Sequence, residues 1–208
     1  MNKMKIVAII GSSVIAGLAA SCSSGSNTTT TVNVNRTTTA ANTTTGNNSA
    51  AAPKKEDDTP AAVKAAMPDA QSFTAMHKDV PKDTILDIEK DTGGKVPDTD
   101  HHSYSAFSTT GGARKQIGAA TIVKANGKDV VIVYENKNNS PAIKEVRVDG
   151  VSADFLKQFA GKGHDDKFTV GGDIKATGTD EATAKAIAQA VRIDSLTMQA
   201  LYGSAHAH

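Results

Sequence analysis

The stretch QIGAATIVKANGKDVVIVYEN, residues 116–136, decides the fold of this chain. Two runs rich in Val and Ile flank the pair Asn126-Gly127. β-Branched residues favour strands, and Asn-Gly suits a type I′ turn because both central residues of that turn need a positive φ. The stretch therefore predicts a hairpin of two antiparallel strands.

The residues that follow the hairpin predict a strand, a short helix and a further strand. PAIKEVRVDG, residues 141–150, alternates apolar and polar side chains and ends in a turn. SADFLKQFAG, residues 152–161, places two Phe and a Leu on one helical face. KFTVGGDIKATG, residues 167–178, predicts a strand with a bend or bulge at Gly171-Gly172.

The last third of the chain predicts one more helix and one more strand. Residues 179–191, with Thr179 as the expected cap, have apolar side chains at helical spacing. LTMQALY, residues 196–202, alternates as a half-buried strand does. The prediction is an α+β fold: an antiparallel sheet of five or six strands, open or curled into a small barrel, with two short helices.

The segment before this domain is ambiguous. Residues 61–67 fit a short helix, residues 83–91 fit either a helix or a strand, and residues 93–100 fit a loop. We therefore place the sheet-rich domain at residues 103–203, with a tail at residues 204–208. The segment 61–102 is left as helix or loop.

The N-terminus has the pattern of a secretory signal peptide. Lys3 and Lys5 precede an apolar stretch at residues 6–20, which is shorter than the roughly 20 residues that span a bilayer. Small residues then lead to Cys22, which is the only cysteine in the chain. We expect residues 1–21 to be removed.

Residues 18–22, LAASC, resemble the lipobox of bacterial lipoproteins. The family usually has Leu three positions before the cysteine, where this chain has Ala19. The resemblance implies that Cys22 is the lipidation site and that acyl chains anchor the protein in a membrane. Ser23 after the cysteine implies the outer membrane or the surface of a Gram-negative cell.

Residues 22–60 consist mostly of Thr, Asn, Ala and charged residues. A segment with so few apolar side chains does not offset its ordering entropy, so we expect a disordered tether between Cys22 and the domain. The full chain has 23 Lys and Arg against 22 Asp and Glu, a net charge of +1. This balance argues against a nucleic-acid partner.

Two short polar segments contain candidate ligands for a metal or haem iron. DTDHHS, residues 98–103, places Asp100, His101 and His102 in a predicted loop, and the second segment contributes His164 beside two Asp residues. The tail adds His206 and His208. The alternative interpretation is that both segments are solvated polar turns that bind no cofactor.

No GxSxG or HExxH pattern of an enzyme is present in the sequence, so we expect no catalytic activity. In layout the chain resembles Gram-negative surface-exposed lipoproteins with a small β-barrel domain. The first hypothesis is a membrane-anchored envelope protein that presents residues 103–116, 136–142 and 161–167 to a macromolecule. The alternatives are a metal or haem carrier that uses the loop histidines, and a structural envelope protein.

Overall fold

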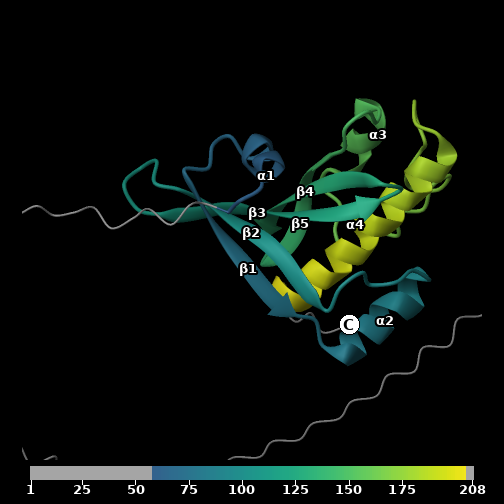
Figure 1. Ribbon diagram of the computed structural model, residues 1–208, viewed down its shortest axis with the longest axis horizontal. Coiled ribbons are helices and arrows are strands. Elements are labelled where there is room, and N and C mark those ends of the chain that lie inside the picture. Colours follow the sequence, from purple (N-terminus) through teal and green to yellow (C-terminus); the bar gives the residue numbers. More distant parts are fainter. Residues whose placement is uncertain (1–57, 205–208) are drawn as a thin grey trace, which may run out of the picture. The chain divides into compact units, whose positions relative to one another are not determined.

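The computed structural model describes residues 58–204 and contains one antiparallel sheet (Figure 1). The predicted signal peptide, Cys22, the tether before residue 58 and residues 205–208 lie outside the described residues. Five strands follow one another in space as they do in the chain: β1 (Ser72–Asp79), β2 (Asp100–Ser108), β3 (Lys115–Ala125), β4 (Lys128–Lys137) and β5 (Ser140–Arg147). β1 and β5 form the two edges, so the sheet is open and the alternative of a closed barrel is wrong.

The predicted hairpin is confirmed as β3 and β4. Ala125 pairs with Lys128, and the two residues between them, Asn126 and Gly127, have φ angles of 47° and 73°. These positive angles are those that a type I′ turn requires. The local sequence therefore predicts both the turn and the register of the hairpin at the centre of the sheet.

Each face of the sheet is covered by a helix. α4 (Glu181–Tyr202) crosses one face and α1 (Ala61–Ala66) lies on the other (Figure 1). Because side chains alternate along a strand, β4 supplies both cores. Val130, Ile132 and Tyr134 pack beneath α4, whereas Val131 and Val133 pack beneath α1.

The strand predicted at residues 196–202 is wrong, because these residues are the last turns of α4. Met198 and Tyr202 fit both periods because residues four apart share a face of a strand and of a helix, and Met198 is buried on the same inner face of α4 as Ile187 and Val191. Neither Gly nor Pro interrupts the helix before its C-terminal cap at Gly203. Its N-terminal cap is Asp180, whose side chain accepts a hydrogen bond from the Thr183 N–H, rather than Thr179.

The strand predicted at residues 167–178 is also wrong. The Asp173 carboxylate accepts hydrogen bonds from the backbone N–H groups of Phe168 and Thr169, which closes the chain into a turn. Phe168 has a φ of 51° and is buried against Phe159, with ring centroids 5.9 Å apart. Side-chain hydrogen bonds to the backbone therefore replace a strand ladder here.

The ambiguous segment forms regular elements of the same compact unit. α1, β1 and α2 (Lys82–Thr92) precede β2, which begins at Asp100 and pairs with β1. Asp100–Ser103 therefore lie in a strand, and the predicted loop over residues 98–103 is wrong beyond Thr99. The predicted helix at residues 152–161 is confirmed as α3 (Ala153–Leu156) and a 3₁₀ turn, η1 (Lys157–Phe159).

Between residues 58 and 204, none of the helices combines the length and the apolar character needed to cross a membrane.

Candidate functional site

A buried carboxylate joins α4 to three strands of the sheet. Asp194 is only 3% exposed. Its Oδ2 accepts hydrogen bonds from the hydroxyls of Thr121 at 2.6 Å and Tyr134 at 2.7 Å. Its Oδ1 lies 3.0 Å from Nε2 of His101, which donates because an ionised carboxylate only accepts. The three donors come from β3, β4 and β2 respectively.

Strand alternation explains why these side chains meet. His101, Thr121 and Tyr134 point to the face that α4 covers, and Asp194 lies on the inner side of that helix. Burial raises the pKa of the Tyr134 hydroxyl well above its usual value, and the neighbouring Asp194 carboxylate raises it further. Tyr134 therefore stays protonated and remains a hydrogen-bond donor to Asp194.

β2 and β3 separate at this carboxylate. Their ladder stops at the pair Tyr104 and Ala120, although β2 continues to pair with β1 as far as Asp100. β3 likewise continues to pair with β4 as far as Ala125. Residues 100–103 and 121–125 therefore have facing strand edges with no ladder between them.

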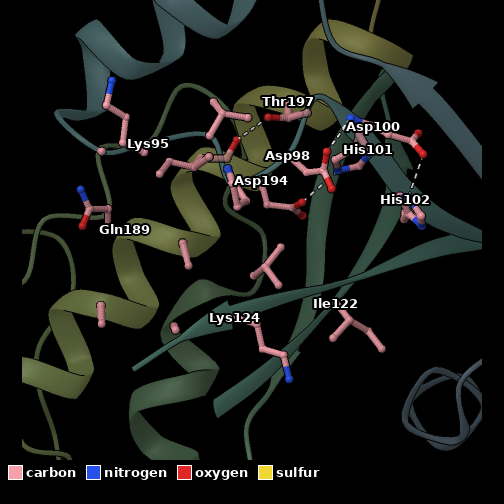
Figure 2. Close-up of a pocket in the computed structure, with 18 of the residues that line it drawn as sticks. Lys95, Asp98, Asp100, His101, His102, Ile122, Lys124, Gln189, Asp194 and Thr197 are labelled. Carbon is pink, nitrogen blue, oxygen red and sulfur yellow. Dashed lines mark hydrogen bonds and ion pairs between the residues drawn. The ribbon is translucent and has the colours of Figure 1, made fainter. Parts of the chain in front are cut away.

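A cavity of about 580 Å³ occupies this gap, between α4 and the loop before β2 (Figure 2). Residues from both faces of the sheet line it: Ile122 belongs to the core beneath α1 and Val123 to the core beneath α4. Ala186, Ala190 and Ile193 form the wall on α4. His101 and Asp194 lie at its inner end, where Nδ1 of His101 is buried and has no hydrogen-bond partner among residues 58–204.

The two lysines that line the cavity are already paired with acids. Lys95 donates to Glu89 at 2.7 Å, and Lys124 forms an ion pair with Asp129. Lys95 also holds the pKa of the Glu89 carboxyl below its usual value through this hydrogen bond. The cavity lining is therefore polar at these two lysines, but acids already balance their charges, so they do not require an anionic ligand.

A second cluster lies on the opposite face of β2. Asp100 and His102 are two residues apart, so they share a face and point away from His101. His77, on β1, is the direct cross-strand partner of His102, and their ring centroids lie 4.1 Å apart. Nδ1 of His77 and Nε2 of His102 lie 3.3 Å and 2.9 Å from Oδ2 of Asp100.

The structure thus separates the residues that the sequence grouped together. His101 is joined to Asp194, Asp100 and His102 are joined to His77, and His164 pairs with Asp165 at 3.2 Å in the turn after η1. The Nε2 atom of His101 is engaged by Asp194 and its Nδ1 is buried, so neither nitrogen is placed to ligate an ion. Cys22, His206 and His208 lie outside the described residues.

Sequence reasoning missed His77, Asp194, Thr121 and Tyr134 as site residues. The sequence did contain a signal for His77. SFTAMHKD, residues 72–79, alternates weakly between apolar and polar side chains, and a single helix separates it from His101 and His102. Asp194 gave no such signal, because its partners are 60 to 93 residues away in the chain.

No protein-family model, curated protein or solved structure matches this chain, so the comparisons assign it to no family.

Proposed function

We propose that this chain is a non-enzymatic binding protein of the bacterial cell envelope, anchored by lipid at Cys22 and displayed at the outer membrane or cell surface. Its ligand is a small, largely apolar molecule with a hydrogen-bonding group, held in the cavity between α4 and the separated edges of β2 and β3. The cavity is the observation that carries the proposal.

The size and lining of the cavity support this class of ligand. Sites for small organic molecules measure about 300–1,000 Å³ and combine apolar walls with a few polar groups. Here Ile122, Val123, Ala190 and Ile193 supply apolar surface. The facing edges at residues 100–103 and 121–125 supply backbone groups that no β2–β3 ladder uses. A ligand with one polar end and an apolar body fits both features.

A small ligand is favoured over the macromolecule that the sequence first indicated. Of the three segments expected to present a binding surface, residues 103–108 and 115–116 lie within strands β2 and β3. Apart from Tyr104, the cavity is lined by residues outside all three segments. Binding in the cavity therefore needs none of those segments to act as a recognition loop.

The His101–Asp194 pair fits a structural role better than a catalytic one. Both carboxylate oxygens of Asp194 accept hydrogen bonds, and their donors fix α4 against the sheet. The side chain of His101 is only 11% exposed. A general base must reach the proton of a substrate with its free nitrogen; Nε2 is taken by Asp194, and Nδ1, the nitrogen without a partner, is buried away from solvent.

The test is a titration of the full chain, carrying Cys22→Ser to prevent acylation, with the apolar fluorescent probe N-phenyl-1-naphthylamine. The decisive variant is Ala190→Trp, which fills the cavity from α4. The matched control is Ala200→Trp, an exposed position on the same helix that does not line the cavity. We expect saturable binding that Ala190→Trp weakens at least tenfold and that Ala200→Trp leaves unchanged. Equal affinities in the two variants would refute the assignment of the cavity.

The anchor is tested separately, by incorporation of labelled palmitate in cells that express the chain. Cys22→Ala should abolish the label and shift the protein from the membrane fraction to the soluble fraction. Unchanged membrane partitioning would contradict the lipoprotein assignment and would leave the result of the probe titration intact.

A further inference from the structure

Three side chains with metal-ligating atoms converge on the face of the sheet opposite α4. His77 lies on β1, Asp100 and His102 lie on β2, and one ligand atom from each lies within 4.8 Å of the other two. We propose that His77, Asp100 and His102 form a binding site for a divalent transition-metal ion such as zinc. Asp100 and His102 also line the proposed ligand cavity, whereas His77 lies outside its lining, so the metal site borders the cavity. The sequence hypothesis of a metal carrier did not include His77.

The separations between the ligand atoms suit a tetrahedral ion. Zinc binds His nitrogen and carboxylate oxygen at about 2.0–2.2 Å, which places neighbouring ligand atoms about 3.3–3.5 Å apart in a tetrahedron. His77 Nδ1 already lies 3.3 Å from Oδ2 of Asp100. His102 Nε2 lies 2.9 Å from the same oxygen, and all three ligand atoms lie within 4.8 Å of one another, so side-chain rotation alone can bring them to one ion.

The strands hold the three residues in place before any ion binds. β1 and β2 pair continuously from Ser72 and Phe107 to Asp79 and Asp100. His77 and His102 are direct partners in this ladder, and such pairs place their Cβ atoms about 4.5–5.5 Å apart. Sites built on strands are more precise than sites on loops, so the ion would not need to order the backbone.

The local charge also favours a cation. Asp79 is the ladder partner of Asp100, and like charges placed directly opposite each other destabilise a sheet. The nearest lysine in the chain, Lys78, points to the other face and donates to the carbonyl of Leu201.

The ligand set indicates which ions would bind. Two imidazoles and one carboxylate suit zinc or copper, whereas magnesium prefers oxygen ligands. The side chains of His77 and His102 are 56% and 50% exposed, so solvent can reach the fourth position of the ion. An open position and exposed ligands are typical of an ion that exchanges with solvent rather than of a closed structural site.

The experiment is calorimetric titration of the full chain with zinc chloride, repeated with cobalt chloride for its visible absorption. The background carries Cys22→Ser, His206→Ala and His208→Ala, which removes competing ligands at the two ends of the chain. The variants are His77→Ala, His102→Ala and Asp100→Asn. His164→Ala is the matched control, because His164 also pairs with an aspartate but lies outside the cluster.

We expect the background chain to bind one equivalent of zinc, to develop a cobalt absorption band and to give no heat with magnesium chloride. Each of the three variants should weaken zinc binding at least tenfold, and the His164→Ala control should stay within twofold. Asp100→Asn keeps the shape of the side chain, so it separates loss of a ligand from loss of fold. The absence of a cobalt band, or equal zinc affinity in all variants, would overturn the site. Neither result bears on probe binding in the cavity.

Discussion

Replacing Asp194 by Leu removes the acceptor that joins α4 to the sheet while keeping a side chain of similar size. The hydroxyls of Tyr134 and Thr121, which are 2% and 1% exposed, would then have lost a partner at 2.7 Å and 2.6 Å. His101 would lose its contact at Nε2 as well. The variant leaves Thr121 and His101 without their Asp194 acceptor, whereas the Tyr134 hydroxyl keeps a contact of 3.4 Å with the Ser195 hydroxyl.

The expected loss of stability follows from the donors that lose Asp194. Each buried donor left without a partner costs about 1–3 kcal/mol. Relief from burying a charge offsets part of the sum, and breaking a buried charged network by removing one member typically costs about 3–5 kcal/mol. We therefore expect Asp194→Leu to lower the free energy of unfolding by about 3–5 kcal/mol, a large share of the roughly 5–15 kcal/mol of an ordinary domain.

Two further substitutions should restore part of the stability that Asp194→Leu removes. Adding Thr121→Val and Tyr134→Phe to Asp194→Leu removes two of the hydroxyls that donated to Asp194, and replacing both partners of a buried hydrogen bond is far less costly than replacing one. The triple variant should regain at least about 2 kcal/mol over the single variant. Asp194→Asn, which keeps one acceptor oxygen, should fall between Asp194→Leu and the unaltered chain.

The assay is urea unfolding of the full chain followed by circular dichroism at 222 nm, which reports mainly on the 22-residue α4. Equal slopes against urea would establish that the variants unfold from comparably compact states. A loss below about 1 kcal/mol for Asp194→Leu, which is less than a single orphaned donor costs, would refute this account of the network. A triple variant no more stable than the single one would refute it equally.

Three smaller perturbations test other parts of the fold. The Arg192 guanidinium beside Asp91 lowers the pKa of that carboxyl, so the pair stabilises the protein above pH 3.8 and loses its effect as pH falls through the lowered pKa. Asp91→Asn should thus cost about 0.2–1 kcal/mol at pH 7, because this carboxylate is 44% exposed, and progressively less in unfolding curves recorded as the pH falls below 3.8. Gly118→Ala should cost about 1–3 kcal/mol in urea, because the added Cβ would lie 2.7 Å from the carbonyl oxygen of Tyr134; an unchanged midpoint would contradict this. Asn126→Ala, at a φ of 47°, should cost about 1–2 kcal/mol in thermal unfolding and more than Asn126→Gly; the reverse order would exclude strain at this turn.

The parts of the fold that the sequence predicted correctly are those with local causes. The hairpin follows from Asn126-Gly127 between β-branched runs, and the start of α4 follows from apolar spacing over residues 184–191. The error at residues 196–202 has a local cause too, because Met198 and Tyr202 are four residues apart and fit both the strand and the helix period. The absence of Gly and Pro from residues 181–202 indicates the length of that helix better than the alternation does.

The candidate site depended on partners that a local pattern does not contain. His101 and His102 are neighbours in the chain, yet β2 sends them to opposite faces of the sheet. β2 itself was missed because DHHSYSAFS has no β-branched residue, so its strand state depends on pairing with β1. In the sequence Asp194 has no feature that distinguishes it from other polar residues of a helix. Only the fold brings it beside His101, which lies 93 positions earlier in the chain.

The central claim is that the cavity between α4 and the separated strands binds a small ligand. The most direct test is to locate the bound probe. We would record ¹H–¹⁵N correlation spectra of the chain carrying Cys22→Ser during titration with N-phenyl-1-naphthylamine. The largest shifts should fall on the amides of residues 122–125 and on Ala190 and Ile193, which line the cavity. Shifts confined to the far ends of β3 and β4, or absent at saturation of the fluorescence signal, would contradict it.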